Sequence, residues 1–381
     1  MKLAERVQSV PPSGIRRFFE LAEEAEDVIS LGVGEPDFSP PWAARDAAID
    51  SLERGRTSYT SNRGLRELRE EIASNAARRY GLEYDPGDEI LVTTGVSEGV
   101  DLALRALIDP GDTVAVVEPA YVSYSPGVTF AGGDPLPVRT REQDDFELTH
   151  DVLTESGAAE ADALIYCYPN NPTGAIMPEP RLREVAEFAR ENDLTVLADE
   201  IYADLTYQRE HTSIATLEGM AERTIVFNGF SKAYAMTGLR LGYALGPAPA
   251  IGAMNRIHQY TMLSSPTTAQ YAALEALRSC DDEVASMKQS FNRRRHYVLS
   301  RFSEMGIECF EAKGAFYLFP ECPGGDDERF AESLLDSEGV AIVPGRVFGA
   351  AGRGHLRVSY ATGLESLREA MDRIERFVDG Y

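Results

Sequence analysis

The stretch "LTVLADE", residues 194–200, is a short apolar run that ends in two carboxylates. Similar runs alternate with helical patterns through the middle of the chain, which is typical of βα units and a largely parallel sheet. The runs are "EILVTT" (89–94), "DTVAVVEP" (112–119), "DALIYCYP" (162–169), "LTVLADE" (194–200) and "TIVFNGF" (224–230). We expect helices at about 97–108, 179–191 and 266–279, and an added edge strand at "LGYALG" (241–246).

The two ends of the chain carry a different pattern. The N-terminal residues resemble a polar arm that leads into a short helix. From about residue 280 a long helical pattern, "DEVASMKQSFNRRRHYVLSRFSEMG", precedes four possible strands and the closing helix "LESLREAMDRIERFVDG" (364–380). The possible strands are "IECFEA" (307–312), "AFYLFP" (315–320), "VAIVPG" (340–345) and "HLRVSY" (355–360).

These patterns predict an α/β fold with two domains. The large domain, residues 46–279, is expected to have a mostly parallel central sheet flanked by helices. The smaller α/β domain is expected to be built from both chain termini. It would take residues 1–45, which include the N-terminal arm, together with residues 280–381.

The chain is strongly acidic. Its 62 Asp and Glu residues outnumber 37 Lys and Arg residues, which gives a formal net charge of −25. Such a surface repels nucleic acid, so DNA and RNA are not expected as partners. Lysine is scarce, and only Lys2, Lys232, Lys288 and Lys313 occur. Dense carboxylates repel one another less at high salt, so we favour a halophilic protein over an ordinary acidic one.

Apolar segments and cysteine spacing indicate where the protein is located and whether it binds a metal. Apolar runs are too short to span a membrane, and the N-terminus lacks the apolar core of a secretory signal. The four cysteines are widely spaced, without a C-x-x-C pair or metal-site spacing. We therefore expect a cytoplasmic protein with no membrane partner and no metal site.

Polar residues follow several of the expected strands at the point where each strand ends. Because ligands of open parallel sheets bind beyond the carboxyl ends of the strands, these residues are expected to share one crevice. Each has an ordinary explanation alone, such as a turn, a helix cap or a surface charge. These residues follow five consecutive strands, and it is improbable that all five strand ends are unrelated turns. The residues are Gly95, Val96, Ser97, Tyr121, Asn171, Asp199, Tyr202, Ser231 and Lys232.

The same segments, in this order, resemble the fold-type I, class I/II aminotransferases that depend on pyridoxal phosphate. The segment "SKAYAMTGLRLGY" (231–243) resembles that family's cofactor-lysine segment, and the resemblance covers nearly the whole chain. The further matching motifs are "SLGVGEPDF" (30–38), "YTSNRGLRELRE" (59–70), "YPNNPTG" (168–174), "ADEIYADL" (198–205), "GAFYLFP" (314–320) and "LRVSYATG" (356–363).

The resemblance implies a role for each residue around the cofactor ring. Lys232 would form a Schiff base with pyridoxal 5'-phosphate, which arginine cannot do, and would then carry the Cα proton. Asp199 would face the pyridine nitrogen and keep it protonated. Asn171 and Tyr202 would hydrogen-bond the ring's 3′ oxygen, and Tyr121 would stack on the ring.

The resemblance also implies a phosphate site. The backbone of Val96 and Ser97, after Gly95, would bind the phosphate at a helix start, and Arg240 would add a bidentate guanidinium. Many relatives place a phosphate-binding Ser or Thr three residues before the lysine. Here that position is Gly229, so Ser231 is the candidate substitute. Tyr59 would reach the phosphate of the neighbouring subunit, which implies a homodimer with shared active sites.

For the substrate, the resemblance assigns Arg357 to the α-carboxylate, with help from Asn171 and the Gly34 backbone. Arg16 could approach the substrate side chain. The expected reaction is ping-pong transfer of an amino group from an L-amino acid to a 2-oxo acid such as 2-oxoglutarate. Aspartate, alanine and aromatic donors all stay open. A β-eliminating C–S lyase on the same fold is the alternative, and a non-catalytic cofactor-binding regulator is a more distant one.

Overall fold

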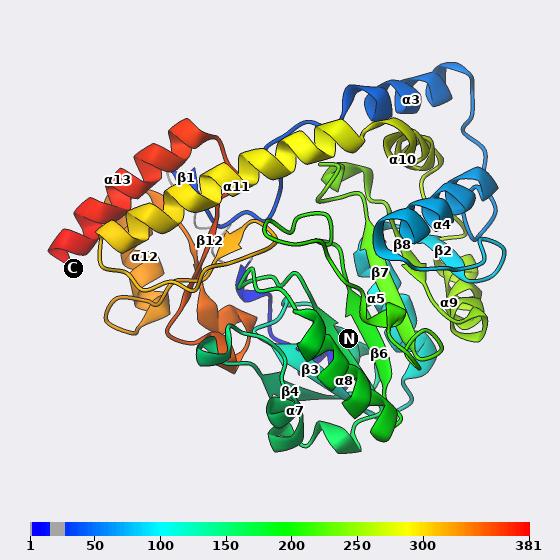
Figure 1. Cartoon of the computed structure of the whole chain (residues 1–381), viewed down its shortest axis with the longest axis horizontal. Helices are drawn as coiled ribbons and strands as arrows, with labels where there is room; N and C mark the ends of the chain where they lie inside the picture. Colours follow the sequence, from blue (N-terminus) through cyan, green and yellow to red (C-terminus); the bar gives the residue numbers. More distant parts are fainter. Residues whose placement is uncertain (1, 16–26) are drawn as a thin grey trace.

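A computed structural model describes residues 2–15 and 27–381. Its centre is a seven-stranded sheet with the order β2-β8-β7-β6-β5-β3-β4 (Figure 1). All neighbouring strands are parallel except β8, which is antiparallel to both β2 and β7. The mostly parallel sheet is therefore confirmed. The strands are β2 (Ile90–Thr93), β3 (Thr113–Glu118), β4 (Asp134–Arg139), β5 (Ala163–Cys167), β6 (Thr195–Asp199), β7 (Thr224–Gly229) and β8 (Gly242–Leu245).

The prediction of an edge strand at residues 241–246 was wrong. Strand β8 lies inside the sheet because the chain folds back after β7 and pairs antiparallel with it, with Gly229 opposite Gly242. All four β8 residues are buried. The true edge next to β3 is β4, whose sequence "DPLPVR" contains two prolines and is mostly exposed. Prolines are tolerated in edge strands but break the apolar pattern, so β4 could not be recognised from sequence.

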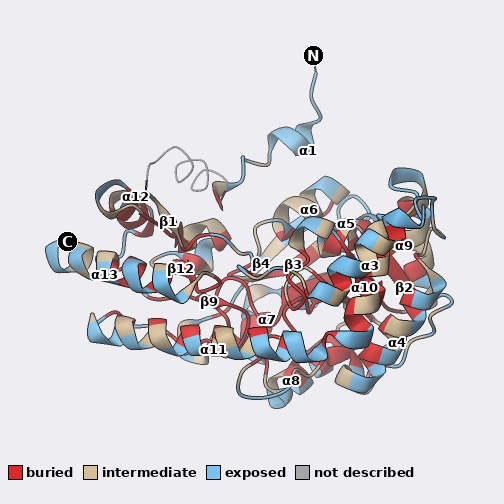
Figure 2. Ribbon diagram, turned by 90° about the horizontal axis from the view of Figure 1, so that it is seen from above, coloured by how far each residue is buried: buried red, intermediate tan, exposed pale blue. Residues whose placement is uncertain are grey.

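Helices flank this sheet, as predicted, and Figure 2 shows their outer faces exposed over a buried interior. Apolar residues of β5 and β7 are buried on both faces, which is typical of a covered parallel sheet. The flanking helices are α3 (Trp42–Glu53), α4 (Arg66–Tyr80), α5 (Gly95–Leu107), α6 (Tyr124–Ala131), α7 (His150–Ser156), α8 (Glu179–Glu191), α9 (Ala248–Thr261) and α10 (Thr267–Ser279). Short 3-10 turns are η1 (Glu142–Asp144), η2 (Ala158–Glu160), η3 (Ile214–Thr216), η4 (Thr237–Leu239), η5 (Gly345–Phe348) and η6 (Ala350–Gly352).

Both ends of the chain meet in a second group of elements. Strand β1 (Ile29–Ser30) pairs parallel with β10 (Val340–Ala341). A three-stranded sheet combines β11 (Val343–Pro344), β12 (Leu356–Ser359) and β9 (Tyr317–Leu318). The long helix α11 (Asp281–Glu304) runs from beside α10 to lie along α13 (Leu364–Gly380), with α12 (Asp327–Glu338) nearby (Figure 1). The division into domains at residues 46 and 280 stays a prediction.

Two other expectations for the chain ends have clear outcomes. The closing helix has the bounds that were predicted, because α13 covers Leu364–Gly380. The strand expected at 307–312 is wrong, since that segment forms only one isolated bridge, between Cys309 and Pro320. The short helix α1 (Glu5–Gln8) has no buried residue and lies at the surface next to α6 (Figure 2).

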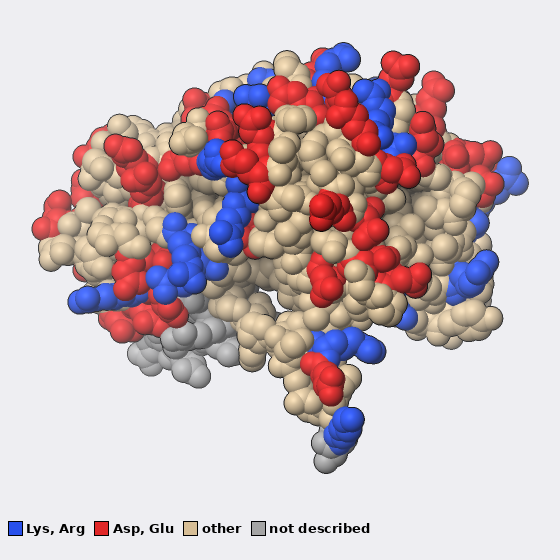
Figure 3. Space-filling model, turned by 90° about the horizontal axis from the view of Figure 1, so that it is seen from below, with Lys and Arg blue, Asp and Glu red and all other residues tan. Residues whose placement is uncertain are grey.

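Acidic side chains are spread over the face drawn in Figure 3 and outnumber the Lys and Arg side chains among them. This view agrees with the composition, but adaptation to high salt stays a prediction. Within residues 2–15 and 27–381, no helix combines the length and the apolar character that crossing a bilayer requires.

Candidate active site

A cavity of about 1000 Å³ lies beyond the carboxyl ends of the parallel strands. It is lined by most of the residues that the sequence singled out, although they are far apart along the chain. The predicted residues that line it are Gly34, Val96, Ser97, Tyr121, Asn171, Asp199, Tyr202, Ser231, Lys232, Arg240 and Arg357. Gly95 lies directly behind it, against Arg240. Tyr59 does not line the cavity and is 79% exposed in the single chain, and Arg16 lies outside the described residues.

Lys232 reaches the cavity from the loop that follows β7. Its Nζ donates a hydrogen bond of 2.6 Å to the carbonyl oxygen of Gly34 and lies 5.7 Å from the ring centres of both Tyr202 and Phe316. Burial, followed by the nearby positive charge of Arg357, lowers the pKa of the Lys232 amine to about 8. The amine is therefore closer to its neutral, nucleophilic form near neutral pH than a surface lysine is.

Asp199 ends strand β6 and is buried at the floor of the cavity. The Tyr124 hydroxyl donates to its Oδ2 over 2.6 Å, and the Ile201 amide donates to Oδ1 over 3.1 Å. Burial raises the pKa of Asp199 to about 6, although these two hydrogen bonds and Lys232 act against the rise. A cation beside this carboxylate would stabilise its charged form, which fits the protonated ring nitrogen of pyridoxal phosphate.

The first turn of α5 and Arg240 form a positively polarised corner. Gly95 has a φ of +76°, and a Cβ there would lie 2.8 Å from Nη2 of Arg240, so the guanidinium packs against the start of the helix. A Cβ on Gly242 would lie 2.6 Å from the Val96 amide nitrogen. Helix amides and a guanidinium together suit a phosphate group.

The same packing explains why Gly229 replaces the Ser or Thr expected before the lysine. A Cβ on Gly229 would lie 2.8 Å from the Cα of Gly242 and 3.0 Å from the carbonyl oxygen of Leu241. A larger residue would push apart the two antiparallel strands β7 and β8. Ser231, the candidate substitute, does line the cavity.

Arg357, on β12, is buried without an ion-pair partner among the described residues. Its Nη1 donates to Oδ1 of Asn171 over 2.9 Å, Nη2 donates to the Gly32 carbonyl, and Nε is buried without a hydrogen bond. Burial lowers the pKa of this guanidinium, and the Tyr317 and Phe348 rings lie 4.6 and 4.8 Å away. A buried cation that lacks an anion is a good receptor for a substrate carboxylate.

Tyr124 and Tyr317 contact the core of the site, but the sequence analysis gave neither a role. Tyr124 lies three residues after Tyr121, in "YVSY", and this second tyrosine close to a predicted site residue was the available signal. Tyr317 lies in the motif "GAFYLFP" that was recognised as a whole. Its hydroxyl lies 2.9 Å from the hydroxyl of Tyr202, so it connects Tyr202 with Arg357.

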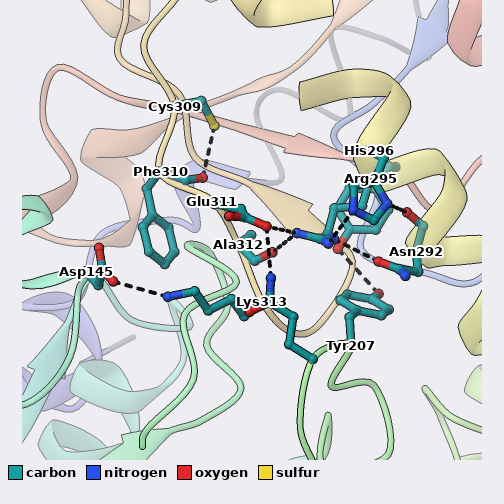
Figure 4. A network of polar contacts seen from close by, with 12 residues as sticks. Asp145, Tyr207, Asn292, Arg295, His296, Cys309, Phe310, Glu311, Ala312 and Lys313 are labelled. Carbon is teal, nitrogen blue, oxygen red and sulfur yellow. Dashed lines mark hydrogen bonds and ion pairs between the residues drawn. The ribbon is translucent and has the colours of Figure 1, made fainter. Parts of the chain in front are cut away.

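A network centred on Arg295 holds the backbone just before Tyr317 (Figure 4). The buried Arg295 guanidinium lies 5.3 Å from the Tyr207 ring centre and donates to the Ala312 carbonyl over 2.7 Å. Tyr207 and Tyr360 both donate to the carbonyl oxygen of Ala315, a residue with a φ of +55°. Since non-glycine residues rarely adopt this φ, the two tyrosines help to fix an unusual turn.

Comparison with known proteins decides the family. A family model described as aminotransferase class I and II matches residues 26–374. The chain belongs to this family. The aminotransferase is 49% identical to the putative aminotransferase YugH of Bacillus subtilis, over 99% of this chain and 98% of the relative. It is 42% identical to aromatic-amino-acid aminotransferase 2 of Thermococcus litoralis, with coverages of 99% and 98%. The structure of aspartate aminotransferase from Thermus thermophilus with maleate matches with a TM-score of 0.93, 38% identity and 99% coverage of each chain.

The protein is therefore an aminotransferase of a family that uses pyridoxal 5'-phosphate. When bound, this cofactor supplies an aldehyde that reacts with amines and a ring that withdraws electrons from the substrate Cα. The amine of Lys232 fits the aldehyde, the buried Asp199 fits the ring nitrogen, and the corner at Arg240 fits the phosphate. Arg357, which has no ion-pair partner among the described residues, fits the carboxylate of a substrate. Among the described residues, no group of three or more His, Cys, Asp or Glu side chains could hold a metal ion.

Proposed function

We propose that this aminotransferase moves the amino group of an L-amino acid to a 2-oxo acid by a ping-pong mechanism, with Lys232 as the proton-transferring residue. The observation that carries the proposal is the convergence of Lys232, Asp199 and Arg357 on one cavity. A transamination site needs an amine, a carboxylate for the ring nitrogen and a receptor for the substrate carboxylate. Asp199 meets that need from the end of β6, Lys232 from the loop after β7, and Arg357 from strand β12.

In this proposal Arg357 binds the α-carboxylate of the amino acid, and Asn171 orients the guanidinium through the 2.9 Å hydrogen bond. The Lys232 amine takes the proton from the substrate Cα, since its lowered pKa favours a neutral base. Asp199 holds the proton of the ring nitrogen, and Tyr124 keeps that carboxylate in place. Gly95, Val96, Ser97, Ser231 and Arg240 would hold the phosphate, Tyr121 would stack on the ring, and Tyr202 would hydrogen-bond the 3′ oxygen.

The lining of the cavity favours apolar or aromatic donors over aspartate. Toward the N-terminal arm and α6 it is lined by Val10, Ile15 and Phe130, and two carboxylates, Glu35 and Asp101, also face it. The described cations of the lining, Lys232, Arg240 and Arg357, all have proposed roles in binding the cofactor or the α-carboxylate. A distal substrate carboxylate would thus meet negative charge without a matching cation.

The names of two relatives, one aromatic and one aspartate aminotransferase, define the choice to be tested. We expect higher kcat/KM for phenylalanine or tyrosine than for aspartate, with 2-oxoglutarate and with pyruvate as acceptors. A preference for aspartate that disappears in Arg16→Ala would show that Arg16 supplies the missing cation. Release of pyruvate from cystathionine at a rate above transamination would instead support the C–S lyase alternative.

Lys232 is tested directly by reducing the protein with borohydride after it has been loaded with pyridoxal phosphate. The cofactor should remain attached to the peptide that contains Lys232, and Lys232→Ala should lose both the attachment and nearly all turnover. A reduced cofactor on another lysine, such as Lys288 or Lys313, would refute the assignment.

We also propose a homodimer in which Tyr59 reaches the partner's site. Tyr59 and Tyr260 are 79% and 85% exposed, and Met262 and Leu263 are also exposed. Segments 58–62 and 263–267 lie side by side, since Asn62 donates to the Leu263 carbonyl over 2.6 Å. An apolar surface of this kind suits contact with a second copy. Sedimentation should give twice the chain mass of 41.8 kDa, and a monomer at micromolar concentration would exclude the proposal.

A further inference from the structure

A buried histidine–glutamate pair lies directly behind the proposed phosphate site. His258, on α9, is fully buried, and its Nδ1 lies 2.7 Å from Oε1 of Glu98 on α5. A carboxylate accepts hydrogen bonds, so Nδ1 carries the hydrogen in this contact. The other ring nitrogen, Nε2, is buried and has no hydrogen-bond partner within residues 2–15 and 27–381. Helices α9 and α5 pack against each other, and the pair therefore links the two helices.

The second oxygen of Glu98 reaches back to the start of its own helix. Its Oε2 accepts a hydrogen bond of 2.5 Å from the amide of Thr94, the N-cap residue of α5. Thr94 immediately precedes Gly95, which packs against Arg240. One carboxylate thus connects the ring of His258 to the turn whose residues Val96 and Ser97 line the cavity.

Two anions, the Glu98 carboxylate and the cofactor phosphate, would both be attracted to the start of α5. The positive end of a helix attracts any nearby negative group, and Glu98 lies in the first turn of α5, where the phosphate is proposed to bind. A freely rotating Glu98 could turn its carboxylate from Thr94 toward the amides of Val96 and Ser97 and repel the phosphate there. One of its oxygens is held by His258 and the other by the Thr94 amide, and neither accepts a hydrogen bond from the amide of Val96 or Ser97 in the described part of the chain.

We propose that His258 is a positioning residue for the cofactor phosphate, acting through Glu98 and Thr94. It touches neither the cofactor nor the substrate, and its effect is to fix the turn 94–97 and the direction of the Glu98 carboxylate. The inference rests on the phosphate site proposed above. It predicts an effect on affinity that depends on whether the ligand carries a phosphate.

The test compares the dissociation constants of the apoprotein for pyridoxal phosphate and for pyridoxal, which lacks the phosphate, followed by the visible absorbance of the bound aldehyde. His258→Leu should raise the dissociation constant for pyridoxal phosphate about tenfold, the size expected when one buried hydrogen bond is lost. The dissociation constant for pyridoxal should stay within about twofold of the wild-type value. His258→Asn should recover most of the loss, because its amide nitrogen falls near the position of Nδ1. Equal weakening of both ligands, or no weakening, would overturn the proposal.

A matched control uses another histidine–glutamate pair. His355 lies 3.1 Å from Glu142 in a different part of the fold, and His355→Gln should leave the ratio of the two affinities unchanged. If His258→Leu does not fold, His258→Gln takes its place. The amide nitrogen of this glutamine falls near the position of Nε2 and not of Nδ1, so the variant should lack the hydrogen bond to Glu98 and bind pyridoxal phosphate as weakly as expected for His258→Leu. Wild-type affinity for the phosphate ligand in His258→Gln would then refute the inference.

Arg240→Gln separates this inference from the phosphate site itself. It should also reduce the preference for pyridoxal phosphate over pyridoxal. If Arg240→Gln keeps the full preference, the proposed phosphate site is wrong. If Arg240→Gln loses it but His258→Leu does not, only the role of His258 is wrong.

Discussion

Replacing Tyr124 with phenylalanine should shift the ionisation of Asp199 and change how the stability of the apoprotein depends on pH. In the wild type, burial raises the pKa of Asp199 from 3.8 to about 6 in the folded state. The folded protein therefore binds this proton more tightly than the unfolded chain. The contribution of Asp199 to the free energy of unfolding is thus lost as pH rises from about 4 to about 6, by about 3 kcal/mol.

Tyr124→Phe removes the 2.6 Å hydrogen bond that favours the charged carboxylate. A hydrogen bond to a charged group contributes about 1.5–3 kcal/mol, equivalent to about one to two pH units. The decline in stability should therefore extend about one to two pH units further in the variant than in the wild type. At acidic pH, where Asp199 is protonated in both proteins, this ionisation should make little difference between them.

The measurement is denaturant unfolding of the apoprotein between pH 4 and pH 8 at constant salt. Tyr168→Phe is the matched control, because it removes a buried hydrogen bond of 2.7 Å to the neutral carbonyl of Phe146 and should displace the curve without changing its slope. Asp199→Asn should remove the decline in unfolding free energy that the ionisation of Asp199 causes. Parallel curves for Tyr124→Phe and the wild type would refute the argument.

Three further outcomes are expected. Arg357→Lys should lower kcat/KM for the amino donor by about tenfold to a hundredfold, because a lysine cannot form the bidentate contact to a carboxylate, and steady-state kinetics with saturating acceptor will measure it. Arg295→Met should raise the KM for the amino donor, since Arg295 acts through the turn before Tyr317. The dissociation constant for pyridoxal phosphate should stay unchanged, and a change in both constants would point to general loss of structure. The free energy of unfolding of the wild type should rise as potassium chloride is increased toward molar concentration, and a stability independent of salt would count against a halophilic protein.

The sequence was sufficient for the buried parallel strands β3, β5, β6 and β7 and for the residues that follow them, but not for the parallel edge strand β4. Apolar runs such as "DALIYCYP" have a length and composition that predict buried strands, and the carboxyl ends of parallel strands must lie on one edge. Asn171, Asp199 and Lys232 could therefore be grouped from the sequence alone. Their detailed roles came from the family resemblance, because strand order by itself says nothing about the cofactor.

Other parts depend on tertiary packing that one-dimensional patterns do not contain. The position of β8 between β2 and β7 follows from the return of the chain through the loop 230–241, whereas its apolar pattern is equally consistent with an edge strand. Tyr124 and Tyr317 are ordinary buried aromatics by pattern, and only the structure places their hydroxyls on Asp199 and Tyr202. His258 gave no signal at all, since a single histidine on a helix is usually part of the core.

The antiparallel return of the chain at β8 has a consequence for how this site can vary. Gly229 and Gly242 face each other at the base of the loop 230–241, and Phe230 donates to the Leu241 carbonyl over 3.2 Å. Lys232 and Arg240 both belong to that closed loop, so the spacing between amine and guanidinium is tied to a fixed strand register. Inserting or deleting one residue would either shift the ladder and turn every β8 side chain to the opposite face, or separate the two cations. Substitutions can accumulate in this segment far more easily than changes in its length.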